Sequence, residues 1–132
     1  MVRRFFSVVI CVLLLSACGA KERIVAYDEQ DAKTIEIKQE IEKMNNIHKA
    51  KIIVAGNDIL VAIEVKPLHA FKEQKIARNL QKELEKKWEH NDVLVSSDFK
   101  LLWEADKLMA EQNEQKVTEK IEKLKKLAKE ET

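Results

Sequence analysis

Cys18 is the residue with the clearest chemical role in this sequence. It ends the stretch Leu15-Ser16-Ala17-Cys18, which follows two basic residues, Arg3 and Arg4, and an apolar run over residues 8–15. Bacterial export signals have this order of basic end, short apolar segment and small residues before the cleavage site. A cysteine thiolate is a nucleophile that can accept a diacylglycerol group. The pattern predicts a lipoprotein signal peptide over residues 1–17, followed by a diacylglycerol-cysteine, with palmitate among its acyl groups, at Cys18.

A plain secretory signal and a membrane-spanning helix are the alternatives for this N-terminal segment. The apolar run from Phe5 to Leu15 is short, whereas a helix that crosses a bilayer needs about 20 apolar residues. Charged residues follow at once, at positions 21–23. A plain signal usually ends in a site of the A-x-A type. The spacing before Cys18 therefore favours the lipoprotein.

Other residues that could do chemistry do not form a recognisable constellation. His48, His69 and His90 each lie near the end of a predicted element, and none has a second histidine at the i+4 spacing that would place two histidine ligands on one helical face. The cluster Ser96-Ser97-Asp98 has no histidine near it in sequence, so we interpret it as a turn and helix cap. With two glycines in the chain, no phosphate-binding loop can be built. We expect no catalytic residue, no metal and no cofactor.

Composition narrows the classes of partner. Removal of residues 1–17 from the 132-residue chain leaves 115 residues with 22 basic and 23 acidic side chains. Phosphate binding needs a concentrated basic patch, so near-neutrality argues against nucleic acid as a partner. Cys11 leaves with the signal peptide and Cys18 carries lipid, so the mature chain has no thiol for a disulfide or a metal. A chain of this length predicts one domain.

Hydrophobic periodicity predicts the order α-β-β-α-β-α. We expect a tether over residues 18–30, a helix over 31–45, strands over 51–55 and 59–65 joined by a turn at Gly56, a helix over 70–88, a strand over 93–95 and a helix beginning at Ser97 or Asp98. Trp88 continues the apolar stripe of the second helix, which places it in the core. A right-handed crossover makes the third strand parallel to the second.

These elements predict an α+β sandwich with a mixed three-stranded sheet. The third strand would pair antiparallel with the first, and the first two helices would share one face of the sheet. The domain would extend over residues 31–112, with a charged amphipathic helix over 113–132. The open face of the sheet, or an edge, is the expected docking place for this last helix.

The C-terminal segment supplies the candidate binding residues. Val117, Ile121 and Leu124 lie on one narrow stripe with Ala128, among many lysines and glutamates. A helix so poor in apolar residues is marginal alone in water, so it should order against its own sheet or against a partner. Since the elements before residue 113 each have an apolar face, we expect the core to fold without it. Trp103 is a further binding candidate.

The segment from Ala50 to Val65 (AKIIVAGNDILVAIEV) and the stretch from Val93 to Asp98 (VLVSSD) resemble the YhcN/YlaJ group of sporulation lipoproteins of spore-forming Gram-positive bacteria. The resemblance covers about residues 18–110. It implies a spore-associated membrane lipoprotein linked to germination, without established catalytic activity. The chain departs from the group in its highly charged second helix, its Lys/Glu-rich tail and the absence of a long low-complexity spacer after Cys18.

Two classes of function follow. The first is a non-enzymatic lipoprotein, anchored to the outer face of the cell or spore membrane, that binds another envelope or spore-membrane protein. The second is an envelope enzyme or accessory factor that acts on lipid or peptidoglycan. The second class needs a convergent polar pocket, and the sequence offers no constellation for one.

Overall fold

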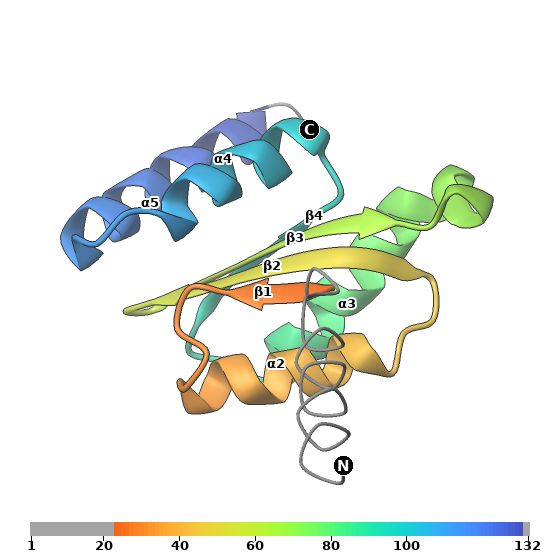
Figure 1. The fold of residues 1–132 in the computed structure, drawn as a ribbon, viewed down its shortest axis with the longest axis horizontal. Helices are drawn as coiled ribbons and strands as arrows, with labels where there is room; N and C mark the ends of the chain where they lie inside the picture. Colours follow the sequence, from red (N-terminus) through yellow and green to blue (C-terminus); the bar gives the residue numbers. More distant parts are fainter. Residues whose placement is uncertain (1–22, 131–132) are drawn as a thin grey trace, which may run out of the picture.

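The computed structural model describes residues 23–130, which form three layers with a four-stranded sheet in the middle (Figure 1). The strands are β1 (Ile24–Ala26), β2 (Ile47–Ala55), β3 (Asp58–Val65) and β4 (Asp92–Ser96). The helices are α2 (Ala32–Glu42), a 3-10 helix η1 (Pro67–Lys72), α3 (Glu73–Lys87), α4 (Phe99–Met109) and α5 (Glu114–Glu130). The α+β class is confirmed. Cys18 lies outside the described residues.

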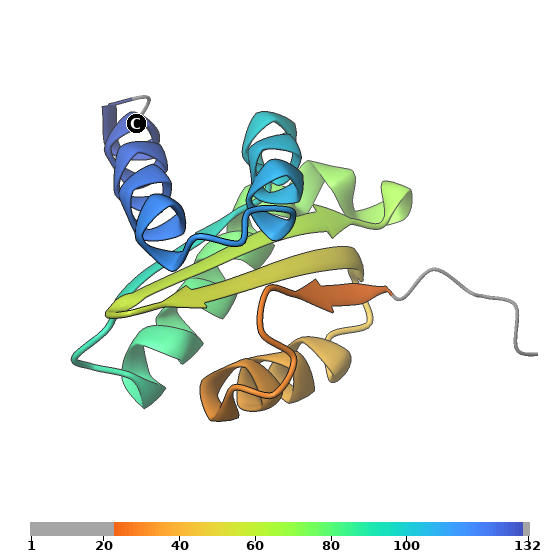
Figure 2. The same ribbon diagram turned by 60° about the vertical axis from the view of Figure 1, so that its left-hand side comes forward.

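The helices divide between the two faces of the sheet. Helices α2 and α3 cover one face, and α4 and α5 cover the other (Figures 1 and 2). The prediction that the first two helices share a face is confirmed. Of the two docking places left open for the last helix, the structure selects the open face of the sheet. The predicted sandwich with its helices on one face plus a charged C-terminal helix is wrong in one respect, because α4 also lies on the second face, beside α5.

The sheet order differs from the predicted one. The strands are ordered β1-β2-β3-β4, and β4 pairs parallel with β3, with Ile59 level with Val93 and Ala62 level with Ser96. The predicted antiparallel pairing of residues 93–95 with residues 51–55 is therefore wrong. The reason is an additional strand: β1 pairs parallel with β2 and occupies the edge that the prediction had given to the third strand. Residues 24–26 thus belong to the sheet, although they were predicted as tether.

Local signals in the sequence are confirmed at the turn and at the caps. Gly56, between β2 and β3, has a φ of +57°, the left-handed region that glycine enters without steric cost. The carboxylate of Asp31 accepts a hydrogen bond from the backbone N–H of Thr34 and caps α2. The carboxylate of Asp98 does the same for Lys100 at the start of α4. Each cap satisfies a backbone donor that the first helical turn leaves without a partner.

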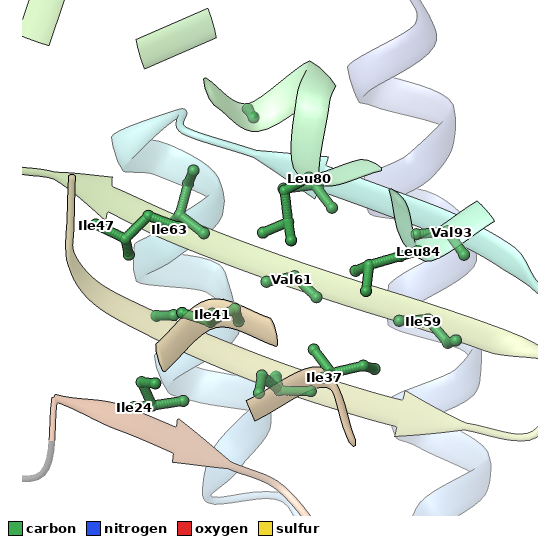
Figure 3. Close-up of a cluster of buried hydrophobic side chains, with 14 of the residues drawn as sticks. Ile24, Ile37, Ile41, Ile47, Ile59, Val61, Ile63, Leu80, Leu84 and Val93 are labelled. Atoms are coloured by element: carbon green, nitrogen blue, oxygen red, sulfur yellow. The ribbon is translucent and has the colours of Figure 1, made fainter. Parts of the chain in front are cut away.

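Two hydrophobic clusters lie on the two faces of the sheet. The first cluster joins α2 and α3 to the sheet through side chains such as Ile37, Ile41, Leu80 and Leu84 (Figure 3), and Trp88 packs at its margin as predicted. The second cluster joins α4 and α5 to the opposite face. Strand β3 is buried on both faces, from Asp58 to Ile63, so its residues alternate between the two clusters. The hairpin of β2 and β3 is therefore the common wall of both cores.

Helix α5 belongs to the second cluster. Val117 and Ile121 are fully buried there against the sheet and α4, and Leu124 is half-buried beside them. Without α5 the apolar residues Ile53 and Leu60, on the same face, would lose part of their cover. This packing argues against the expectation that the core folds without the tail, because the sheet is buried on both sides by a helix layer; truncation of α5 tests that expectation.

Candidate functional site

A groove opens beside the edge strand β4, between α3 on one face of the sheet and α4 and α5 on the other. Its volume is about 870 Å³. Its lining residues are Glu73, Gln74, Ala77 and Arg78 of α3; Val95, Ser96, Ser97 and Asp98 at the end of β4; Phe99, Lys100, Leu101 and Glu104 of α4; and Leu124, Leu127 and Ala128 of α5. The groove therefore combines apolar side chains with charges of both signs.

Two large apolar side chains of the groove are strongly exposed. Phe99 is 78% exposed and Leu127 is 51% exposed, and each is contributed by a different helix. A concave surface with exposed apolar side chains and a few polar groups is typical of a binding site. The charged side chains Arg78, Lys100 and Glu104 can fix the orientation of a bound segment, since charge contacts contribute more to specificity than to affinity.

The polar residues at the end of β4 already have structural partners. The hydroxyl oxygen of Ser96 accepts a hydrogen bond from the backbone N–H of Asp98 at 3.1 Å, and Asp98 Oδ1 accepts one from the N–H of Lys100 at 3.0 Å. These bonds turn the chain from β4 into α4. The interpretation of this stretch as a strand-to-helix cap is confirmed. A nucleophile and base would need a different arrangement, with a base oriented toward the hydroxyl.

The edge of β4 is partly closed by a glutamine of α3. The backbone N–H of Val95 donates to Gln81 Oε1 at 3.1 Å, and Gln81 Nε2 donates to Glu85 Oε1 at 2.9 Å. An open strand edge is a template for pairing with another strand. Gln81 therefore occupies one of the backbone positions to which an incoming extended peptide would bind.

The predicted binding residues separate into three groups. Trp103 is exposed, and Lys107 Nζ lies 3.6 Å from the centre of its ring, a cation–π contact on the surface of α4. Leu124 lines the groove. Val117 and Ile121 are in the second cluster, so they bind this chain's own sheet and are not free for a partner. The sequence correctly placed Val117, Ile121 and Leu124 on one face of α5. The structure adds that this face packs on the sheet of the same chain.

A buried lysine of α5 was not identified from the sequence. Lys125 is 5% exposed, and its Nζ lies 2.7 Å from Asp58 Oδ1 and 3.4 Å from Asp92 Oδ2; it also donates to the backbone oxygen of Asp92. The ammonium group thus ties α5 to the start of β3 and of β4. Its spacing of four from Ile121 could have indicated this position, but lysine usually lies on the solvated face.

The histidines lie on different parts of the fold. His48 is in β2 and His69 is in η1, near the end of the sheet where β3 finishes, whereas His90 lies in the turn before β4. Over residues 23–130, no group of three or more His, Cys, Asp or Glu side chains is arranged to hold a metal ion. Nor does any helix in this range have the length and apolar character needed to cross a membrane.

The fold and the groove define a small three-layer α+β domain with a concave surface beside an edge strand. Residues 20–126 match the family described as Sporulation lipoprotein YhcN/YlaJ, and the chain belongs to this family. The match extends into α5, in agreement with the packing of α5 on the sheet. No curated protein and no solved structure gives a significant match to the chain. Membership of a lipoprotein family implies membrane attachment through a lipid anchor.

Proposed function

We propose that this chain is a non-enzymatic lipoprotein of the spore membrane that binds a membrane or envelope protein through the groove beside β4. The groove carries the proposal, because it places Phe99 and Leu127 in a concave surface rimmed by charges. The partner would present an extended segment with one or two large apolar side chains. Such segments bind in grooves beside strand edges through apolar pockets and backbone hydrogen bonds.

The proposed anchor is the lipid on Cys18. Two acyl chains give stable attachment to a bilayer, whereas one gives marginal binding. An exported lipoprotein is held at the extracytoplasmic face, which in a spore-former would be the outer face of a spore membrane. A role in germination fits this place, since a membrane-bound domain can contact membrane proteins directly.

Two polar residues of the groove have structural roles, so we propose that the groove is not catalytic. Ser96 and Asp98, two polar residues that line the groove, make hydrogen bonds that hold the turn into α4. Because these two side chains serve the turn, the groove is better suited to binding than to catalysis. This supports a binding module over an enzyme that acts on lipid or peptidoglycan.

A photo-crosslinking experiment tests the groove. A photoreactive amino acid is placed at Leu127, in the groove, and at Ile35, which is 45% exposed on α2 and is absent from the groove lining. In sporulating cells, Leu127 should give a discrete covalent adduct with one protein, and Ile35 should not. Phe99→Glu in the same chain should abolish the adduct, because it puts a charge into an apolar contact. Equal adducts from the two positions would exclude the groove as the binding site.

Two further measurements test the location. Cys18→Ala should release the chain from membranes or leave it with its signal peptide uncleaved; a variant that is processed and membrane-bound like the parent would exclude lipidation at Cys18. Quantification in dormant spore membranes and in vegetative membranes should show enrichment in the spores. Equal amounts in both would contradict a role that is specific to the spore.

A further inference from the structure

The 3-10 helix η1 presents two large apolar side chains to solvent. Leu68 is 85% exposed and Phe71 is 80% exposed, more than any other large apolar residue of residues 23–130. In a 3-10 helix, residues three apart lie directly above one another, so both side chains share one face of η1. The rest of the described fold leaves most of the surface of both side chains uncovered. Leu68 and Phe71 thus form an apolar wedge on η1, and Figure 1 shows η1 at one end of the molecule.

Basic residues are close to this wedge in the sequence, and one of them contacts it. Between Lys66 and Arg78 the chain has four basic residues and one acidic residue, Glu73. The ammonium group of Lys72 lies 5.4 Å from the centre of the Phe71 ring. Lysine and arginine beside exposed apolar side chains are typical of surfaces that bind bilayers, where the apolar groups enter the interface and the cations contact lipid phosphates.

The chain enters the domain at the same end of the sheet as η1. The backbone oxygen of Arg23 accepts from Ala50, and its guanidinium donates to the backbone oxygens of Met44 and Ile47 at 3.0 Å. The residue before η1, Lys66, donates its N–H to Asn46 at 2.9 Å. Arg23 and Lys66 thus bond to the same loop between α2 and β2, and Figures 1 and 2 both show η1 and the start of β1 at one end of the sheet.

The length of chain between Cys18 and this end restricts the orientation of the domain. Five Cα–Cα steps separate Cys18 from Arg23, which span at most about 18 Å when fully extended. A domain of about 110 residues has a radius of gyration of about 13 Å and is therefore about 30 Å across. The link is shorter than the domain, so an anchored domain cannot turn its opposite end to the bilayer. A lipid on Cys18 would therefore keep the end with Arg23 and η1 close to the bilayer.

We propose that η1 is a membrane-docking element, in which Leu68 and Phe71 enter the bilayer interface and the nearby basic side chains contact anionic lipid headgroups. This inference rests on the proposed lipidation of Cys18, which supplies the short link. The docked orientation also brings the groove close to the bilayer, since α3 follows η1 directly and its first turns line the groove. A partner segment in the groove would then lie next to the membrane.

Site-specific fluorescence on the mature chain, expressed with its signal peptide and mixed with protein-free vesicles, tests the docking. Once Cys18 carries lipid the chain has no other cysteine after residue 18, so Phe71→Cys provides a single thiol for an environment-sensitive probe. Ile35→Cys is the matched control, because Ile35 is also exposed and lies in the first turn of α2, at the opposite end of the sheet. The probe at position 71 should show a blue shift and quenching by nitroxide-labelled lipids, and the probe at position 35 should show neither.

The vesicle experiment separates the failure of the docking from the failure of the anchor. If the labelled chain does not float with the vesicles, the lipid anchor on Cys18 is excluded. If it floats, but both probes report water, the anchor stands and the docking of η1 is excluded. Phosphatidylcholine vesicles with added phosphatidylglycerol should give stronger quenching at position 71 than phosphatidylcholine alone. Equal quenching would support the apolar contact and overturn the contribution of the basic side chains.

Discussion

The two faces of the sheet are closed in different ways. Among residues 23–130, sixteen buried apolar residues close the face under α2 and α3, and nine close the face under α4 and α5. The second cluster therefore has less apolar surface from which to draw stability. The second face adds the ammonium group of Lys125, held by Asp58 and Asp92. A buried ion pair is weak support for stability but sensitive to the loss of one partner. The α4/α5 layer should therefore be the more easily perturbed one.

Of the changes considered, removal of α5 should lower the free energy of unfolding most. Truncation after Gln112 removes Val117 and Ile121 and uncovers part of the second face of the sheet. Burial of one such side chain contributes about 1.5–3 kcal/mol, so the loss of these two should cost about 3–6 kcal/mol, which is a large part of the stability of a small domain. Circular dichroism melts should show an unfolded or strongly destabilised chain. An unchanged melt would mean that the first face folds independently of the second.

Loss of the buried ammonium group of Lys125 should have the second-largest effect on the free energy of unfolding. Lys125→Met removes the partner of Asp58 and leaves its carboxylate, which is 12% exposed, without that ion pair. Breaking one side of a buried pair costs about 3 kcal/mol. Urea denaturation should show that Lys125→Met is clearly less stable than the neighbouring surface variant Lys126→Met. Replacing an exposed lysine should change the free energy of unfolding by about 0.5 kcal/mol or less. If both variants match the parent, the second face does not depend on its ion pair.

A change at the hairpin should affect both faces to the same degree. Gly56→Val forces a β-branched residue to a φ of +57°, at a cost of about 1–2 kcal/mol. A Cβ at this position meets no atom within 4 Å, so the cost comes from the backbone and not from a clash. Amide hydrogen exchange should show faster opening in both clusters. Gly56→Asn is the control, because asparagine tolerates this conformation better.

An unchanged melting temperature for Gly56→Val would contradict the strain at the turn. Faster exchange in one cluster only would instead show that the hairpin is not their common support.

The smallest effect should come from the ion pair that joins α2 to α3. The Lys87 ammonium, 2.6 Å from Glu40 Oε1, holds the pKa of Glu40 below its ordinary value, and Lys43 adds to this against the opposing effect of burial. The same hydrogen bond raises the pKa of Lys87. The stabilisation by Glu40 is present above the pKa that its carboxyl has in the unfolded chain and is lost as the pH falls through the lowered folded value.

Thermal melts of Lys87→Met and of the parent across this acidic range check the expectation. The variant should be slightly less stable at neutral pH, and the difference should vanish once Glu40 is protonated. Lys86→Met, next to it on the solvated surface, should behave like the parent throughout. A difference that persists in acid would mean that Lys87 acts through packing of its aliphatic stem.

Local features were predictable because they depend on neighbours in the chain. Asp31 and Asp98 cap helices, Gly56 turns a hairpin, and Trp88 follows the apolar stripe of α3; each needs only a side chain and the backbone a few residues away. The α+β class and the parallel direction of β4 relative to β3 also follow, since a crossover through one helix fixes the hand of the connection. Family membership could be identified from the hairpin and the stretch around Val95.

Strand adjacency and the fate of single side chains were decided by the tertiary structure. Strand β1 has three residues, too few for a periodicity, and it exists because the edge of β2 supplies backbone partners. Its presence displaces β4 to the edge of β3, which creates the groove, and it shortens the link to Cys18. Lys125 is buried because Asp58 and Asp92, far from it in the chain, meet at one point of the sheet. Except for β1, sequence by itself determined which segments would be helices, strands and turns, since those choices are made within a few residues. Long-range pairing determined which edges, faces and charges would meet, since that choice depends on every other strand of the sheet.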